Sequence, residues 1–249
     1  MNLIDVHAHL DLGEFDKDLD EVLEKCAKVG VKAIIANSVD QKSGERVLAL
    51  AKKYQTIKAA LGLYPVEAAT MSEEAFQDTL SFIKKHKPIA IGEIGLDYQE
   101  VDESHRKTME HRFRALVLLA KELNVPVLVH SRKAELRTIE VLEDIGHRKV
   151  VMHCFMGRKH LAQRVLDNTW YLSIPANVTY HEQFQQNTKM ADMSRLLTET
   201  DTPYLSPERG ARNDPSNVLH GIRKISELKG LTVEDAANII YMNYQTLFL

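Results

Sequence analysis

Short apolar runs recur along the whole chain, and the spacing between them leaves room for a helix between most neighbouring pairs. The eight runs occupy residues 3–6, 31–36, 57–61, 88–93, 126–130, 149–153, 170–174 and 196–201. Each is short for a helix and has the continuous apolar character of a strand buried on both faces. Parallel strands are joined by crossover helices, so this alternation predicts a parallel sheet covered by helices.

The longer segments between the runs show helical spacing. In residues 16–29, apolar side chains from Leu19 to Ala27 fall on one face, and Gly30 ends the pattern. Further helices are expected at about residues 43–54, 72–86, 103–123, 181–193, 217–228 and 233–248, with another between the fifth and sixth strands. We therefore expect an α/β fold, a single-domain TIM-type (β/α)8 barrel over residues 1–249. A doubly wound open sheet is the alternative, which periodicity alone does not exclude.

Composition excludes several classes of protein. No apolar run approaches the roughly 18 residues of a membrane span, and the start of the chain lacks the features of a signal peptide, so we expect a cytoplasmic protein without membrane association. Cys26 and Cys154 are too few for a disulfide framework, and we expect both to be buried packing residues. The net charge of −3 argues against broad electrostatic coating of nucleic acid, but it allows an enzyme with a small local contact.

Ionisable residues gather at the C-terminal ends of the expected strands. These residues are His7, His9, Glu93, His130, His153 and Asp201. Each alone has an ordinary structural interpretation, but in a barrel these ends share one rim, where active sites are built. Burying them together requires compensation, which a metal centre provides. The set suits two divalent ions (Mg, Mn or Zn), with Glu93 able to bridge them, and the absence of thiolate ligands favours an open catalytic site.

Formal charge indicates an anionic substrate. Two carboxylates give −2 against +4 from two divalent ions, which leaves +2 to attract an anion such as a phosphodiester. Four arginines near the same rim, Arg132, Arg158, Arg209 and Arg212, are candidates for binding flanking phosphates, although solvated surface charge is the commoner role of arginine. Aromatic residues at strand ends, Tyr64, Tyr98, Phe155 and Tyr204, are candidates for stacking on bases or for ordinary packing.

Five separated motifs resemble the TatD family of metal-dependent deoxyribonucleases, within the amidohydrolase-like group of barrels. They are residues 5–10, 92–98, 126–132, 153–155 and 199–205, and Arg209-Gly210 with Arg212-Asn213 continues the pattern. The resemblance implies that His7, His9, Glu93 and Asp201 bind one ion and that Glu93, His130 and His153 bind the other. It also implies that DNA is the substrate, as single strands or ends cleaved exonucleolytically, with Tyr98 and the four arginines as substrate-binding candidates and no obligate protein partner.

The chain departs from the family pattern at three places. Tyr64 and Val66 stand where the family often has two histidines, Lys133 replaces an acid, and Pro175-Ala176 stands where a glycine is usual. None of these positions belongs to the expected ligand set. The departures therefore leave a hydrolytic centre intact and indicate a change in DNA contacts or substrate choice.

The expected chemistry is attack of a metal-bound hydroxide on phosphorus, with Asp201 as general base and Glu93 as the second catalytic carboxylate. Glu199 shares the strand face of Asp201, and we interpret it either as a group behind the ligands or as an interior acid paired with a basic side chain. Two other functions stay open. A metal-dependent amide or ester hydrolase would use the same centre, and a non-catalytic barrel would bind metal or a partner without turnover.

Overall fold

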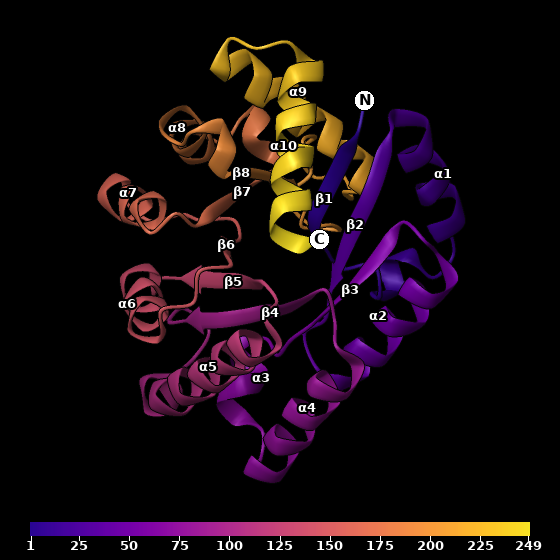
Figure 1. Cartoon of the computed structure of the whole chain (residues 1–249). Helices are drawn as coiled ribbons and strands as arrows, with labels where there is room; N and C mark the ends of the chain where they lie inside the picture. The colour runs from indigo at the N-terminus through magenta and orange to yellow at the C-terminus, as the bar shows by residue number, and fades with distance from the viewer.

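The computed structural model describes residues 1–249 and contains one parallel sheet of eight strands in sequence order (Figure 1). The strands are β1 (Leu3–Ala8), β2 (Val31–Asn37), β3 (Ile57–Leu61), β4 (Ala90–Asp97), β5 (Val127–Arg132), β6 (Val150–Met152), β7 (Tyr171–Pro175) and β8 (Leu196–Glu199). A bridge between Ala8 and Thr202 joins β1 to the segment after β8, and the Thr198 hydroxyl of β8 donates to the Ile4 carbonyl of β1 over 2.7 Å. The predicted barrel is confirmed, and the open-sheet alternative is wrong.

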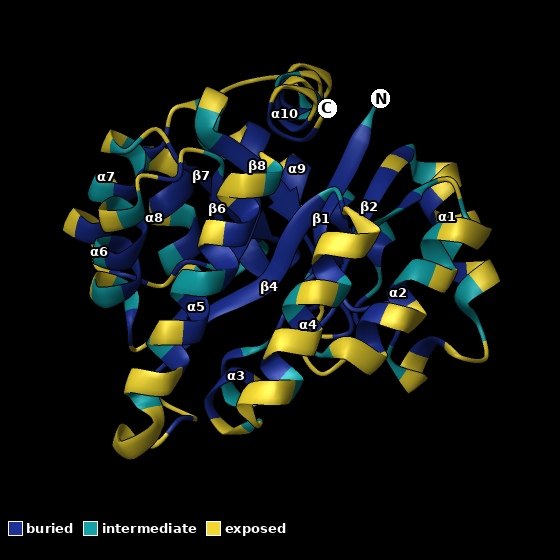
Figure 2. Cartoon of the chain, turned by 60° about the horizontal axis from the view of Figure 1, so that its bottom comes forward, coloured by how far each residue is buried: buried dark blue, intermediate teal, exposed yellow.

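Helices surround the barrel and bury the outer face of the strands (Figures 1 and 2). They are α1 (Leu19–Val29), α2 (Gln41–Lys53), α3 (Pro65–Thr70), α4 (Glu73–His86), α5 (Glu103–Leu123), α6 (Glu135–Ile145), α7 (Lys159–Asp167), α8 (Glu182–Met190), α9 (Val218–Lys229) and α10 (Val233–Phe248). Four short 3₁₀ turns join them: Gly13–Phe15, Ala176–Thr179, Met193–Arg195 and Pro215–Asn217. Exposed residues concentrate on the outward faces of the helices in Figure 2, while the strands are buried.

Several predicted boundaries move for local reasons. The helix expected over residues 16–29 begins at Leu19, because a 3₁₀ turn occupies Gly13–Phe15 before it. The helix expected from Ser43 begins two residues earlier, since the Asp40 carboxylate caps it by accepting from the Ser43 amide over 2.7 Å. Strand β4 runs four residues past Glu93 because its second half pairs with β5 as far as Arg132. Helices α3 and α7 were not predicted.

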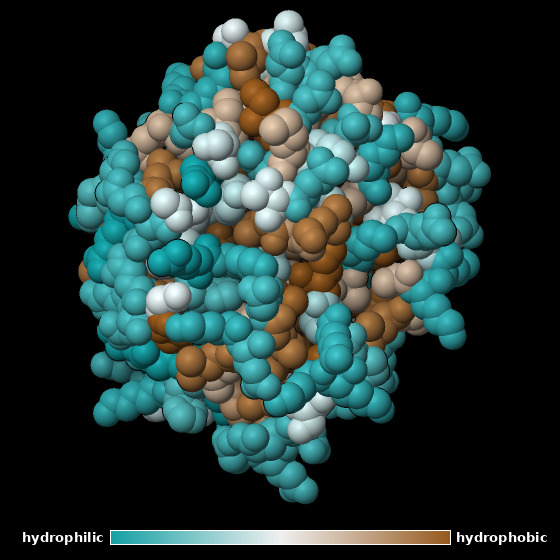
Figure 3. Space-filling model, in the orientation of Figure 1, coloured by the Kyte–Doolittle hydropathy of each residue, from teal (hydrophilic) through white to brown (hydrophobic).

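The core is continuous from the barrel interior to the inner faces of the helices. Its largest fully buried side chains include Phe15, Phe76, Phe113 and Phe155. Phe155 therefore serves as a packing residue, the ordinary alternative to base stacking. On the face seen in Figure 3, hydrophilic residues dominate the periphery and apolar residues show between them near the centre. No helix of the structure combines the length and apolar character needed to cross a bilayer.

Candidate metal centre

His7 and His9 lie at the C-terminal end of β1 and turn the same way, as strand alternation predicts. Their Nε2 atoms are 3.2 Å apart, and both side chains are buried. Behind them, the buried Asp5 carboxylate accepts hydrogen bonds from the Thr200 amide and hydroxyl, which ties β1 to the segment after β8. Burial raises the pKa of Asp5 to about 8, although these hydrogen bonds lower it. The histidine pair is therefore held on a fixed backbone.

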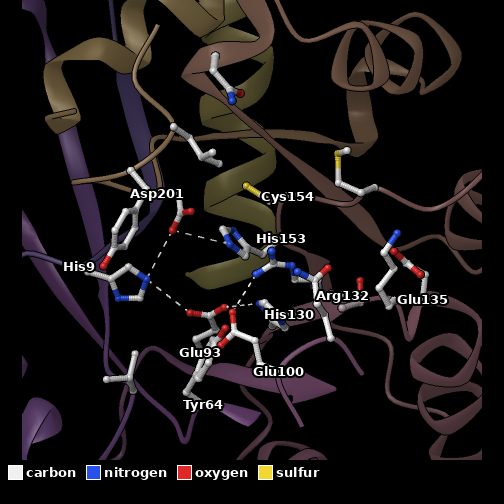
Figure 4. Close-up of a pocket in the computed structure, with 18 of the residues that line it drawn as sticks. His9, Tyr64, Glu93, Glu100, His130, Arg132, Glu135, His153, Cys154 and Asp201 are labelled. Carbon is white, nitrogen blue, oxygen red and sulfur yellow. Dashed lines mark hydrogen bonds and ion pairs between the residues drawn. The ribbon is translucent and has the colours of Figure 1, made fainter. Parts of the chain in front are cut away.

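Two carboxylates from distant strands converge on the histidine pair (Figure 4). Glu93 Oε2 lies 3.4 Å from His7 Nε2 and 3.4 Å from His9 Nε2. Asp201 Oδ1 lies 3.7 Å from His7 Nε2, 3.5 Å from His9 Nε2 and 3.8 Å from His153 Nε2. Ligands arranged tetrahedrally at zinc-like distances lie about 3.4 Å from one another. The spacing of these atoms is therefore that of a cation's coordination shell.

Hydrogen bonds behind the imidazoles direct their lone pairs to the centre. His9 Nδ1 lies 3.1 Å from the Asn37 carbonyl and His153 Nδ1 lies 2.8 Å from a Glu199 oxygen, and both partners only accept. In its neutral form each ring consequently carries its proton on Nδ1, which leaves Nε2 as the atom that can bind a cation. This arrangement of imidazole and carboxylate groups fits a divalent metal, and the Cys154 sulfur lies within 4.8 Å of possible ligand atoms of His153 and Asp201.

His130 is held differently. Its Nε2 lies 2.9 Å from an Asp97 oxygen, and its Nδ1 lies 2.9 Å from the Glu93 oxygen that faces away from His7 and His9. Asp97 therefore fixes a proton on Nε2 and leaves Nδ1 as the atom that faces the centre. The two oxygens of Glu93 point to different histidines, which is the geometry that a bridging carboxylate requires. His153 completes the group by stacking on His7, with ring centroids 3.6 Å apart.

The pKa values of these groups show how the site balances its charge. Burial alone would raise the pKa of Glu93, but His7, His130 and His9 hold it well below its ordinary value. Burial would lower the pKa of His9, yet Asp201 and Glu93 raise it well above 6.5. The pKa of His153 rises to about 9 because Glu199 and Asp201 outweigh its burial. Without a metal ion, protonated histidines thus balance the negative charge of the carboxylates. A bound cation would take over this role and release the protons from the histidines.

Glycines allow the strands to approach closely enough to aim Glu93 and His130. A side chain at Gly62 would meet the backbone carbonyl oxygen of Glu93 at 2.5 Å, and one at Gly95 would meet the His130 carbonyl oxygen at 2.0 Å. Only glycine permits these contacts between β3, β4 and β5. Gly62 and Gly95 are therefore needed for the close packing of the strands that carry Glu93 and His130.

The centre lies at the floor of a cavity of about 890 Å³ at the C-terminal rim (Figure 4). Of the predicted substrate-binding arginines, Arg132 lines this cavity and pairs with Glu100 over 2.9 Å. Tyr64 and Tyr204 also line it. Cys154 lines it too, which corrects the expectation of a buried packing residue, because its thiol and amide donate to Glu199. Cys26 is buried as expected.

The other predicted substrate-binding side chains lie outside the cavity lining. Both terminal nitrogens of Arg212 pair with Asp18, since the loop after β8 folds back against the start of α1. Arg209 is exposed and covers the Tyr180 ring at 4.7 Å. Tyr98 packs under Arg106, whose guanidinium carbon is 4.4 Å from the ring centre, and Arg158 is exposed at the start of α7. These residues are therefore held in structural contacts or in solvent.

Two carboxylates, Asp97 and Glu199, contact the candidate ligands from behind, and their positions in the sequence indicate this role. Asp97 lies four residues after Glu93 on the same strand, so alternation places both side chains on one face. Glu199 precedes Asp201 by two residues and reaches His153, Cys154 and Ser173, the last over 2.5 Å. Glu199 thus fits both interpretations made from the sequence, since it is an interior acid whose basic partner is itself a candidate ligand.

The chain is similar to known proteins over almost its whole length. A family model described as TatD related DNase matches residues 4–249. A Bacillus subtilis relative, "Uncharacterized metal-dependent hydrolase YabD", is 36% identical over 252 residues, covering 99% of this chain and 98% of the relative. The human protein named "Deoxyribonuclease TATDN3" is 33% identical over 260 residues, covering 100% of this chain and 95% of that protein. The crystal structure of YjjV, a TatD homolog from Escherichia coli, superposes with a TM-score of 0.91 at 28% identity, covering 99% and 97% of the two chains.

Proposed function

Because this chain belongs to the TatD-related DNase family and is a metal-dependent hydrolase, we propose that it hydrolyses phosphodiester bonds of DNA. The observation that supports this best is the convergence of imidazole nitrogens on the oxygens of Glu93 and Asp201 in one rim cavity. DNA is the substrate, and single strands or strand ends are the form attacked.

We propose that two divalent ions, Mg, Mn or Zn, bind here. His7, His9, Glu93 and Asp201 would hold one ion, while Glu93, His130 and His153 would hold the other. When bound, such ions lower the pKa of water and neutralise charge that develops on phosphate oxygens. The separate orientation of the two Glu93 oxygens supports the bridging role.

Asp201 is the proposed general base. Its side chain is 16% exposed at the cavity surface, whereas the side chain of Glu93 is almost fully enclosed at 4%. Asp201 can therefore be reached by an attacking water while one of its oxygens faces three histidines. Its carboxylate accepts the proton of that water, and Glu93 holds the histidines in place.

The charge of the cavity lining supports both metal dependence and end cleavage. Five carboxylates line it, Glu67, Glu93, Glu100, Glu135 and Asp201, against two full cations, Arg132 and Lys133. A polyanion is repelled from such a lining unless bound cations offset it. With few basic groups for flanking phosphates, the cavity suits the terminal nucleotides of a strand, which supports exonucleolytic cleavage.

A chelation and add-back assay tests the proposal. Purified protein is stripped with EDTA, and end-labelled single-stranded DNA is then incubated with Mg²⁺, Mn²⁺ or Zn²⁺. We expect no cleavage without metal and a ladder that shortens one nucleotide at a time after add-back. Hydrolysis of a panel of amides and esters without cleavage of DNA would instead identify the rival activity, and metal binding without turnover of any substrate would identify a binding barrel.

A further inference from the structure

The cavity has two chemically different walls above the metal centre. The loops after β3, β4 and β5 contribute a charged wall that includes Glu67, Glu100, Arg132, Lys133 and Glu135. The segments that follow β6, β7 and β8, including the start of α8, contribute a wall without carboxylates or full cations beyond Asp201 at its base. It includes Met156, Asn177, His181, Phe184, Tyr204 and Leu205. A substrate phosphate bound at the floor would thus have different surroundings on its two sides.

Asn177 is the most unusual residue of the neutral wall. Its side chain is 3% exposed, and neither amide atom makes a hydrogen bond with the protein. Leaving a buried amide oxygen without a donor is unfavourable for the folded protein. Oδ1 is fully enclosed, so Nδ2 is the end of the amide that opens to the cavity. The backbone at Asn177 is fixed, because its main-chain carbonyl accepts from the Tyr180 and His181 amides, each at 3.0 Å.

His181 repeats the pattern four residues later. Its Nδ1 is buried without a partner, and its ring packs against Phe184 with centroids 4.5 Å apart. The loop between Asn177 and His181 is anchored, since Gln185 donates to the Val178 carbonyl and the Tyr180 hydroxyl donates to the Ser206 carbonyl. Two unpartnered polar side chains on one rigid loop therefore face the same part of the cavity, beside exposed Tyr204 and Met156.

We propose that this neutral wall is a nucleobase subsite in which Asn177 hydrogen-bonds the edge of the base while Tyr204 and Met156 contact its face. The proposal rests on the proposed function and adds the part of the substrate that the metal centre does not contact. The Nδ2 group of Asn177 that opens to the cavity is a donor, and it fits an acceptor on the edge of a base, such as N7 of adenine. Apolar and aromatic neighbours without full charges suit a neutral planar ring, and base stacking on such side chains is tolerant of sequence.

The test compares ligands that differ only in the base. Binding of deoxyadenosine monophosphate and of deoxyribose 5-phosphate is measured by calorimetry on the full-length wild-type protein and on Asn177→Leu. Leucine has nearly the size of asparagine and removes the unpaired amide. We expect the wild type to bind the nucleotide about tenfold or more tighter than the base-free phosphate, and the variant to lose most of that difference.

Two further readouts separate a recognition role from a structural one. A structural asparagine would lower the melting temperature when replaced, whereas we expect Asn177→Leu to melt at the same temperature as the wild type or higher, because an unsatisfied buried group is gone. Turnover of bis(p-nitrophenyl) phosphate, which has no base, should stay within about twofold of wild type, since the metal ligands are untouched. An unaltered ratio of nucleotide to base-free binding in a folded variant would overturn the proposal.

Lys133→Ala on the charged wall is the matched control. Loss of a cation near a phosphate should weaken the nucleotide and the base-free phosphate alike and reduce the salt dependence of binding. A selective loss of base discrimination in this variant would place the base on the wrong wall and overturn the assignment. Failure of wild type to cleave DNA, with base discrimination in binding intact, would reject the proposed nuclease but keep the nucleotide subsite.

Discussion

The two ends of the barrel differ in whether their buried polar groups have hydrogen-bond partners of their own. At the N-terminal end three buried side chains bond backbone carbonyls. Trp170 Nε1 bonds the His147 carbonyl, His147 Nε2 bonds the Val125 carbonyl, and Asn243 Nδ2 bonds the carbonyls of Met193 and Leu196. At the C-terminal end one Asp201 oxygen faces three imidazoles, and other polar atoms have no partner at all.

This difference indicates that polar groups at the N-terminal end stabilise the fold, whereas those at the C-terminal end serve binding and catalysis. A donor with one acceptor gains stability from folding, since neither group is left unpaired. A set of crowded acceptors and unpaired donors is costly in the free protein and becomes favourable when a cation or substrate binds. Substitutions at the C-terminal end should therefore reduce function while leaving stability unchanged or higher, and those at the N-terminal end should do the reverse.

The largest effect is expected for Asp201→Asn. Asparagine keeps the size of the side chain but cannot accept the proton of water, so DNA hydrolysis should fall by at least about 10³-fold. Turnover on end-labelled single-stranded DNA at saturating metal measures this, and thermal melting should show no loss of stability. Near-wild-type cleavage by a contaminant-free preparation would remove Asp201 from the role of base.

Glu199→Gln should have the next largest effect, on metal affinity. The amide still fills the space between His153, Cys154 and Ser173, but it no longer fixes the His153 proton with a charged acceptor. Replacing a carboxylate behind a metal-binding histidine typically weakens binding about 10- to 100-fold, which calorimetric titration of stripped protein measures. Glu143→Gln is the matched control, because that acid pairs with Arg164 on the outside of the barrel. Equal metal affinity in both variants would contradict the positioning role.

The sequence allowed the barrel and the residues of the centre to be predicted, for one physical reason. Apolar runs mark doubly buried strands, and in a parallel barrel every strand end reaches one rim, so His7, Glu93, His130 and Asp201 meet however far apart they are in the chain. Of the four arginines, only Arg132 lies where this rule predicts. Arg212 pairs with Asp18, 194 residues away, because a long side chain can turn from the rim toward any acid within reach.

At the N-terminal end, Asn243→Ala should reduce stability without reducing activity. The Asn243 amide bridges α10 to the start of β8, and its loss removes the hydrogen bonds to the Met193 and Leu196 carbonyls, of which the second is buried. We expect a loss of about 2 kcal/mol in the free energy of unfolding, measured by denaturant titration. Specific activity per folded molecule should match wild type. Asn177→Leu is expected to leave stability unchanged or to raise it, so the two variants together compare the two ends of the barrel directly. Equal destabilisation by both variants would show that the two ends do not differ in this way.

The smallest effect concerns His147 and pH. Burial lowers the pKa of His147 below 6.5, and nearby Lys121 and Lys149 lower it further, although the hydrogen bond to Val125 opposes this. As pH falls below 6.5, His147 becomes protonated in the unfolded chain but not yet in the folded protein. The free energy of unfolding therefore decreases with falling pH until the pKa of His147 in the folded protein is passed. The stability of His147→Gln should therefore fall less than that of wild type between pH 7.5 and 5.5. Trp170, the only tryptophan, bonds the His147 carbonyl, so its fluorescence reports unfolding at this spot. Parallel pH curves for the two proteins would show that the N-terminal end is insensitive to this charge.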